Sequence, residues 1–475
     1  MLDVDGLEQT GLAGHSLRDI ARALRERRVS AVNLLDHAKQ RYAALEPALH
    51  GYVAWNPDLS TPMAEAADTA FRAGSDRGHL QGITMSIKDI FGVKGYETKV
   101  GSCRAFPEKF NQEGPLLTAL RGQCTVFTGK TQTDEFAYAG LGTVNDGPIP
   151  RNPWDGARHR AAGGSSSGAP VSLWQETALV ALATDTSGSV RRPAALTGTA
   201  GLKLTVGRWP ADFVPLCPTM DTPGILTRSV DDLRFAFYAI DTIVADKSRG
   251  WHEPEITPGD ITMAICDEHM WDECDPGVAE AVQAAIKELT GAGVKCLKIS
   301  VPEVSDAYQT VLDGGIVSSE FMAFVEKEVP EWLDILQPQL KIRLAGPDRP
   351  NLSAVQYLQN LREIRRCAEA VIGRLEGIDV LVGPTLPITP PLLEDVAAPE
   401  AWQAINKRAV KNTYIASLLG LCGITLPVGL DANHMPVGMQ MLAKPWQEER
   451  LLDIGCAFER ILGQCTERLG RPPMV

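Results

Sequence analysis

The chain has 475 residues, of which 44% are hydrophobic and 22% charged, an ordinary composition for a globular protein with a large core. This composition excludes a disordered or fibrous protein. The net charge of −13 excludes a broad basic surface, so we expect no nucleic-acid partner.

Helical spacing dominates the first 75 residues, where we expect packing helices. Apolar residues recur at helix spacing after Ser16 and again after Ser30, and serine is a typical helix N-cap. From about residue 80, short β-like runs alternate with helical segments, which is typical of α/β proteins with a mixed, largely buried sheet. The runs interpreted as strands lie at residues 83–87, 125–128, 178–183, 261–265, 294–299, 380–382 and 424–427.

The second half of the chain continues this pattern. Residues 235–375 are mostly helical apart from two of those runs, and we expect them to cap one face of the sheet. Residues 376–475 would then return to the core that residues 80–230 begin, within one large domain. The uncharged stretch at residues 412–430 is long enough to raise the question of a membrane span. Glycine and proline interrupt it, so we interpret it as a buried helix followed by a buried strand.

The first ten positions carry three acidic residues and no Lys or Arg, which does not resemble a secretory signal. We therefore expect a cytoplasmic protein with no membrane partner. The ten cysteines form no CxxC pair, and the eight histidines form no HExxH motif. This distribution favours reduced thiols over a disulfide scaffold and indicates neither a metal site nor another cofactor.

Small residues are concentrated in one part of the chain. Eleven of the 43 glycines fall within residues 140–207, and residues 163–189 hold nine Ser or Thr. Such segments permit close backbone approach and unusual backbone angles, which binding loops require. We therefore expect the functional site here.

Two general motifs in or near this segment lack the sequence context that they usually have. The sequence GKT at residues 129–131 resembles the end of a phosphate-binding loop, but six residues instead of four separate it from the preceding glycine. Residues 164–168 match GxSxG, with Ser166 at the nucleophile position of an α/β-hydrolase. That motif needs a buried strand before it, whereas residues 158–163 are charged and then small. Neither motif is favoured.

A three-part spacing is a more specific signal. Lys88 stands in SIKD, Ser165 follows it by 77 residues in GGSSSG, and Ser189 follows by a further 24 in TDTSGSVR. With these residues, the stretch 161–208 closely resembles the amidase signature family of serine amidohydrolases. Supporting matches run in the same order along most of the chain, at residues 130–137, 151–154, 220–230, 379–387 and 412–442.

The resemblance implies an α/β fold in a single large domain, residues 1–475, with a central mixed, twisted β-sheet, helices on both faces and a helical cap. It also implies hydrolysis of a linear carboxamide through an acyl-enzyme. Ser189 would be the nucleophile, Ser165 a proton bridge normally held by a cis peptide after Gly164, and Lys88 the base. The pKa of this lysine must fall, because only the neutral amine accepts a proton.

Supporting roles follow from the same resemblance. The backbone N–H groups that would stabilise the oxyanion belong to Thr186, Ser187, Gly188 and Ser189. The side chains expected to orient the serines and this loop are Ser166, Asp185 and Arg191. The family usually has glycine at the positions of Ser167 and Ser187 and proline at that of Leu204. Ser187 therefore adds a side chain beside the expected oxyanion site.

The acyl pocket of the family is formed by segments that are apolar and partly aromatic in this chain. Its candidate residues are Phe136, Tyr138, Leu141, Trp209, Phe213 and Leu216. These residues favour a small aryl or aliphatic carboxamide as the partner molecule, and each also suits a hydrophobic core. No cofactor is expected, and a homodimer is compatible with the sequence.

Three other interpretations stay open. The chain could be the A subunit of a glutamyl-tRNA(Gln) amidotransferase, but that protein carries a Tyr-rich segment that residues 351–366 lack. It could be a catalytically silent binding protein, although Lys88, Ser165 and Ser189 are all retained. A Ser-His-Asp site would need a histidine such as His159, whose two flanking arginines favour a solvated loop.

Overall fold

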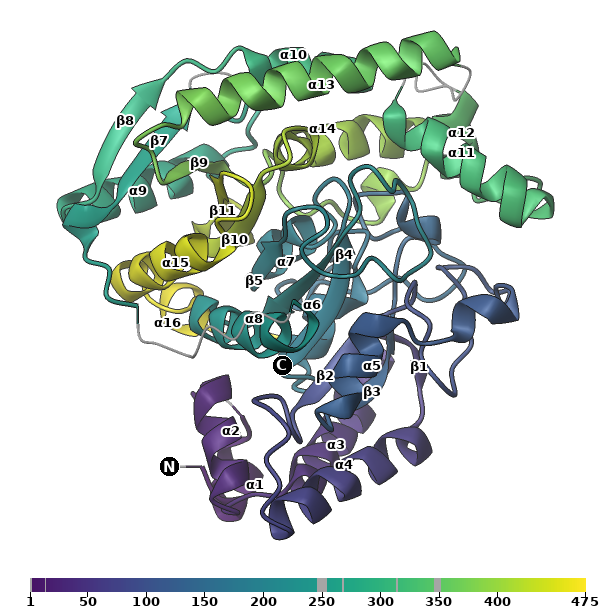
Figure 1. Ribbon diagram of the computed structural model, residues 1–475, viewed down its shortest axis with the longest axis vertical. Coiled ribbons are helices and arrows are strands. Elements are labelled where there is room, and N and C mark those ends of the chain that lie inside the picture. Colours follow the sequence, from purple (N-terminus) through teal and green to yellow (C-terminus); the bar gives the residue numbers. More distant parts are fainter. Residues whose placement is uncertain (1, 13, 246–253, 267–268, 313–314, 346–351) are drawn as a thin grey trace.

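The computed structural model describes residues 2–12, 14–245, 254–266, 269–312, 315–345 and 352–475. An eleven-stranded sheet runs through this part of the chain in the order β1-β3-β2-β4-β6-β5-β10-β11-β9-β7-β8 (Figure 1). The strands are β1 (Tyr52–Trp55), β2 (Thr84–Lys88), β3 (Val126–Thr131), β4 (Val180–Asp185), β5 (Ala200–Lys203), β6 (Thr222–Thr227), β7 (Thr262–Cys266), β8 (Lys295–Ile299), β9 (Val380–Pro384), β10 (Cys422–Leu430) and β11 (Pro436–Ala443). β2 pairs in parallel with β3 and β4, and β7 with β8 and β9, whereas the other pairs are antiparallel. The predicted mixed α/β sheet is confirmed.

Helices precede, connect and follow these strands. Their bounds are α1 (Val4–Thr10), α2 (Leu17–Arg25), α3 (Ala31–Leu49), α4 (Pro57–Arg72), α5 (Pro115–Gly122), α6 (Gly168–Trp174), α7 (Arg191–Thr197), α8 (Val230–Val244), α9 (Val278–Gly291), α10 (Glu303–Leu312), α11 (Ile316–Glu328), α12 (Pro338–Ala345), α13 (Ala354–Arg374), α14 (Pro399–Leu418), α15 (Glu448–Leu462) and α16 (Cys465–Leu469). As predicted, Ser16 and Ser30 cap α2 and α3, each accepting a hydrogen bond from the backbone N–H three residues further on.

Helices cover both faces of the sheet. Gly423 and Ile424 are neighbours in β10, so their side-chain directions point to opposite faces. A Cβ on Gly423 would lie 3.6 Å from the Arg191 side chain of α7, whereas a Cβ on Gly455 of α15 would lie 2.5 Å from Ile424. α7 and α15 therefore pack on opposite faces, where α6 contacts α7 and α8 contacts α15.

The seven runs predicted as strands all coincide with strands, namely β2, β3, β4, β7, β8, β9 and β10. β5, β6 and β11 were not predicted, because glycine, proline and methionine interrupt their β-branched residues in AGLK, TPGILT and PVGMQMLA. β1 was also missed, since it is a four-residue strand between two long helices. Partner strands on both sides stabilise β5, β6 and β11 despite this composition.

The expected cap at residues 235–375 requires correction. Residues 262–299 form β7, α9 and β8, and parallel pairing of β7 with β9 adds these strands to the end of the sheet. The helices α10 to α13 form a separate helical part at one end of the molecule (Figure 1), whereas residues 235–244 belong to α8, which packs against α15. The prediction for residues 412–430 is confirmed, because α14 ends at Leu418 and the buried strand β10 follows. Within the described residues, no helix is both long enough and apolar enough to cross a membrane.

Close packing at the start of α6 gives a test of the fold. A Cβ on Gly168 would lie 1.9 Å from the carbonyl oxygen of Gly51 and 2.6 Å from the backbone nitrogen of Gln132. We expect Gly168→Ala to lower the free energy of unfolding by about 1–3 kcal/mol, because α6 must move away from β1 and β3. Gly373→Ala in α13 is the matched control, since a Cβ there meets no atom within 4 Å. It should raise the free energy of unfolding by up to about 1 kcal/mol.

Urea unfolding followed by circular dichroism measures both variants. Equal effects of the two substitutions would contradict the close packing of α6.

Candidate functional site

Lys88 is the last residue of β2 and is fully buried. Its Nζ donates hydrogen bonds to Ser165 Oγ at 2.7 Å and to Thr184 Oγ1 at 3.0 Å. Burial lowers the pKa of Lys88 to about 7, although the carboxylates of Asp134 and Asp185 oppose this shift. An amine with this pKa is partly neutral at neutral pH and can then accept a proton.

Ser165 follows a cis peptide bond after Gly164, as the family resemblance implies. Asp134 holds the surrounding segments together. Its carboxylate accepts hydrogen bonds from the N–H of Gly142 at 3.0 Å and of Val144 at 2.8 Å, and its own N–H donates to the Ser165 carbonyl at 3.0 Å. A Cβ on Gly164 would lie 2.1 Å from the Asp134 carboxylate, so the close approach requires glycine. Burial raises the pKa of Asp134 to about 6.

Ser189 lies in the loop between β4 and α7, with 1% of its surface exposed. Asp185 organises this loop, because its carboxylate accepts from the Gly188 N–H at 2.7 Å and from Nε and Nη2 of Arg191 at 3.0 Å. Burial alone would raise the pKa of Asp185, but the charge and hydrogen bonds of Arg191 outweigh it and lower this pKa to about 2. Asp185 and Arg191 thus form a buried ion pair beneath Ser189.

The expected set of oxyanion donors needs one correction. The Gly188 N–H points to Asp185 and is not free for a ligand. The N–H groups of Thr186, Ser187 and Ser189 have no acceptor within the described part of the chain. The Thr186 side chain donates to Asp221 at 2.6 Å, which holds the far side of the loop.

Ser166 connects the loop that carries Ser165, residues 163–167, with the loop that carries Ser189, residues 186–190, and these are the two serine loops. Its N–H donates to the Ser189 carbonyl at 3.4 Å, and its Oγ donates to the Thr184 carbonyl, also at 3.4 Å. The Ser166 side chain therefore faces the end of β4, and its hydrogen bonds hold the two loops together.

Arg192 is a site residue that the sequence analysis missed. Its Nη2 donates to Ser189 Oγ at 3.2 Å, its Nε to the Gly164 carbonyl at 3.0 Å, and its Nη1 to Thr413 Oγ1 at 3.0 Å and to the Ser187 carbonyl. Arg192 thus connects both serine loops with α14. The available signal was the pair of adjacent arginines in α7, a short helix that is otherwise apolar or small.

Three of the candidate pocket residues lie in one segment beside the site. A Cβ on Gly140 would lie 3.2 Å from Arg192 Nε, so residues 138–142 pass next to this arginine. Tyr138 and Phe136 contact Phe321 of α11, with ring centroids 4.9 and 5.3 Å apart, and Leu141 is buried.

The other candidates lie on the segment after β5. Phe213 packs against Phe91, three residues beyond Lys88, and the Leu216 N–H donates to Asp221 at 2.9 Å. Trp209 requires correction. Its indole N–H donates to Asp241 at 2.9 Å and its ring stacks on Phe237, so it belongs to the core against α8.

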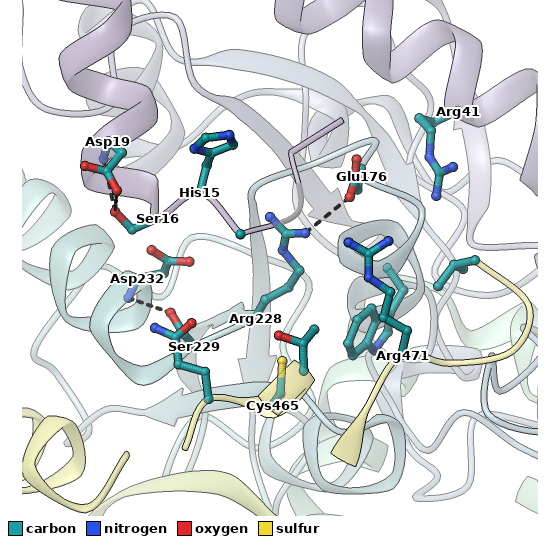
Figure 2. Close-up of a pocket in the computed structure, with 15 residues that line it drawn as sticks. His15, Ser16, Asp19, Arg41, Glu176, Arg228, Ser229, Asp232, Cys465 and Arg471 are labelled. Atoms are coloured by element: carbon teal, nitrogen blue, oxygen red, sulfur yellow. Dashed lines mark hydrogen bonds and ion pairs between the residues drawn. The ribbon is translucent and has the colours of Figure 1, made fainter. Parts of the chain in front are cut away.

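A separate cavity of about 270 Å³ lies near the end of strand β6 that is opposite to Ser189 (Figure 2). Arg228, at the end of β6, lines it, whereas the start of β6 pairs with Asp185 near Ser189. Arg41, Arg228 and Arg471 line this cavity together with Asp19, Glu176 and Asp232. Arg228 forms an ion pair with Glu176, and the mixed charges favour a structural role.

One group of potential metal ligands occurs among the described residues, formed by Asp306, Glu363 and Cys367. Arg366 donates to both carboxylates, at 3.2 Å to Asp306 and at 2.5 Å to Glu363. A cationic group therefore already occupies the position of a metal ion, and we infer no metal site.

The fold, together with the buried lysine and serines, defines a hydrolase of the amidase type. The chain matches the Amidase family over residues 33–452 and belongs to that family. It is 40% identical to 2-amino-5-chloromuconic acid deaminase of Comamonas testosteroni, over 97% of this chain and 98% of that protein. It is 27% identical to the A subunit of the glutamyl-tRNA(Gln) amidotransferase of Methylobacillus flagellatus, over 95% and 97% of the two chains. A crystal structure of an amidase superimposes with a TM-score of 0.83 at 26% identity, covering 94% of this chain and all of that one.

The ion pair beneath Ser189 can be tested by removing one charge. We expect Asp185→Asn to lower the free energy of unfolding by about 3–5 kcal/mol, because Arg191 would remain buried without a counter-charge. Asp36→Asn is the matched control. It breaks a pair with Lys39 whose side chains are 33% and 53% exposed, and should cost less than about 1 kcal/mol. Denaturant unfolding measures both, and a small effect at Asp185 would contradict the buried ion pair.

Proposed function

We propose that the protein hydrolyses the C–N bond of a linear carboxamide to a carboxylate and ammonia or an amine, with Ser189 as the nucleophile. One observation carries this proposal. Lys88 Nζ lies 2.7 Å from Ser165 Oγ at a buried position that lowers the pKa of the lysine to about 7. The loop that carries Ser189 is connected to the loop that carries Ser165, because the Ser166 N–H donates a hydrogen bond to the Ser189 carbonyl.

In the proposed reaction, neutral Lys88 accepts the proton of Ser165 while Ser165 accepts the proton of Ser189. Ser189 Oγ bonds to the carbonyl carbon, and the carbonyl oxygen becomes an oxyanion. The N–H groups of Thr186, Ser187 and Ser189 have no acceptor among the described residues and are suited to stabilise this charge.

The acquired proton then returns through Ser165 to the amide nitrogen. The C–N bond breaks, the neutral amine leaves, and the acyl group stays on Ser189. A water molecule loses a proton to the same relay and attacks the ester, which releases the acid and restores Ser189. These steps balance with water as the second reactant, and they require no oxidant and no metal.

The similarities to known proteins bear on the substrate. The relative with 40% identity is named as a deaminase of 2-amino-5-chloromuconic acid, so we expect ammonia as the amine product. The amidotransferase relative shares 27% identity, and residues 351–366 of this chain lack the Tyr-rich segment of such proteins. We therefore propose a free-standing enzyme without partner chains.

Substitution of the nucleophile tests the reaction in the chain purified alone. We expect Ser189→Ala to abolish ammonia release and Lys88→Ala to reduce kcat at least about a thousandfold, while both variants keep the native circular dichroism. Ser172→Ala is the matched control, because this buried serine of α6 bonds to Ser86 and not to the relay. The substrates are acetamide, benzamide and aminoacyl amides, which release ammonia, and an anilide, which releases aniline. Near wild-type release by Ser189→Ala would refute the assignment.

The pH dependence tests the role of Lys88. Its pKa is lowered to about 7, and it acts as a base only when neutral. We therefore expect kcat/KM to rise with pH, about tenfold per unit below the pKa, and to level off above it. Initial rates from pH 5 to pH 9 measure this profile. A rate that falls as the pH rises through 7 would contradict a neutral lysine base.

A further inference from the structure

Asp221 immediately precedes β6 and connects two segments of the candidate site. It is 3% exposed, and the donors that its carboxylate contacts are a hydroxyl and two backbone N–H groups. Oδ1 accepts from the Thr186 hydroxyl at 2.6 Å, and Oδ2 accepts from the N–H groups of Leu216 and Cys217, both at 2.9 Å. Asp221 therefore connects the loop that carries Ser189 with the segment that carries the candidate pocket residue Leu216.

Different parts of the fold direct the N–H groups of Thr186 and Ser189. Both N–H groups belong to trans peptide groups, in which the C=O and the N–H point in opposite directions. The carbonyl in the same peptide group as the Ser189 N–H is that of Gly188, and it accepts from the backbone N–H of the second residue of α7 at 2.7 Å. The carbonyl in the same peptide group as the Thr186 N–H is that of Asp185, and it accepts from the Thr222 hydroxyl at 2.9 Å. α7 thus directs one expected oxyanion donor, and the start of β6 directs the other.

The Thr186 N–H is buried and has no partner among the described residues. Thr186 is 2% exposed, and its N–H has no acceptor in that part of the chain. Buried N–H groups of folded proteins are almost always paired, so this one is suited to a bound group. Its direction depends on two contacts. Rotation of the peptide group would break the bond from Thr222, and displacement of Thr186 would break the bond to Asp221.

We propose that Asp221 is a positioning residue, which fixes the Thr186 N–H toward the oxyanion and holds the segment of Leu216 in register with it. The inference rests on the proposed function, because the oxyanion forms only in that reaction. The negative charge on this oxygen develops in the transition state and is absent from the bound amide. Loss of the positioning contact should therefore lower kcat and leave KM unchanged.

Two substitutions of Thr186 remove or keep the bond to Asp221 without altering the Thr186 N–H. Valine has nearly the shape of threonine but no hydroxyl, whereas serine keeps the hydroxyl. We expect Thr186→Val to lower kcat at least about tenfold with KM within about twofold of wild type, and Thr186→Ser to keep kcat within about threefold. Initial rates with the most rapidly hydrolysed amide of the panel used for Ser189→Ala measure both variants. Equal losses in the two variants, or parallel changes in kcat and KM, would show a packing effect and overturn the proposal.

Thr227→Val is the matched control, because Thr227 is a buried residue at the other end of β6. Its hydroxyl donates to the Ser229 carbonyl at 2.7 Å, so the substitution removes one buried hydrogen bond in the same strand. We expect it to keep the wild-type kcat. A loss of kcat as large as that of Thr186→Val would overturn the proposal.

A double-mutant cycle tests whether Asp221 acts through Thr186. Asp221→Asn removes the carboxylate charge, and we expect it to lower kcat while KM stays near the wild-type value. Adding Thr186→Val should then lower kcat much less than in the wild-type background, because both substitutions affect one bond. Losses that multiply would overturn the proposal.

Boronic acids give a readout that does not depend on turnover. A serine hydroxyl adds to the boron atom and forms a tetrahedral anion, which resembles the oxyanion intermediate. Calorimetry should detect binding of phenylboronic or methylboronic acid to the wild type, with affinity at least about tenfold lower in Thr186→Val. Equal affinity of the two proteins, or binding of neither acid by the wild type, overturns the proposal.

The two readouts separate the positioning role from the proposed hydrolysis. Unchanged kcat in Thr186→Val, with turnover that depends on Ser189, overturns the role of Asp221 and leaves the hydrolysis intact. Boronic acid binding that is weakened by Thr186→Val, without turnover of any amide of the panel by the wild type, would support the positioning of the Thr186 N–H and reject the proposed hydrolysis.

Discussion

The hydrogen bond between Lys88 and Ser165 is the interaction on which the candidate site depends. An amine buried at the end of β2 is tolerated when its charge is offset or its proton is lost. Two nearby carboxylates, Asp134 and Asp185, favour the proton. Both are engaged by other donors, Asp134 by backbone N–H groups and Asp185 by Arg191 and the Ser189 loop. Burial therefore prevails, and the pKa of Lys88 falls to about 7. The hydrogen bonds that organise the loops also occupy the carboxylates of Asp134 and Asp185. These carboxylates therefore do not keep Lys88 protonated.

Close backbone approach is the second constraint, and it accounts for the two serines that stand where the family usually has glycine. Ser167 is fully buried, and its Oγ donates to the Gln132 carbonyl at 3.3 Å. The opposing residue is Gly142, where a Cβ would lie 2.7 Å from the Ser167 Cβ. Glycine at 142 thus provides the volume that serine at 167 occupies. Ser187 is 8% exposed, more than Thr186 or Ser189 in the same loop, and its carbonyl accepts hydrogen bonds from Arg192 and Thr413. Its side chain can therefore vary without moving the backbone.

The predictability of this structure follows the range of the interactions involved. Helix caps such as Ser16 and strands rich in β-branched residues depend on local sequence, and they were predicted. β5, β6 and β11 depend on partner strands distant in the chain. Glycines and prolines interrupt the sequence pattern of these strands, so they were not predicted. In the site, the family spacing was sufficient to bring Lys88 and Ser165 together. The competition of Asp185 for the Gly188 N–H and the packing of Trp209 against α8 depend on exact placement, which no motif encodes.

The adjacent arginines of α7 show how neighbouring residues of one type acquire different environments. Successive residues of a helix point about 100° apart, so Arg191 and Arg192 cannot face the same partners. Arg191 points toward the sheet, where it meets Asp185 and Gln440 of β11. Arg192 points toward the serine loops, where its described contacts are neutral oxygens. The first charge is neutralised within the fold and supports it. The second contacts Ser189 Oγ and connects the two serine loops with α14.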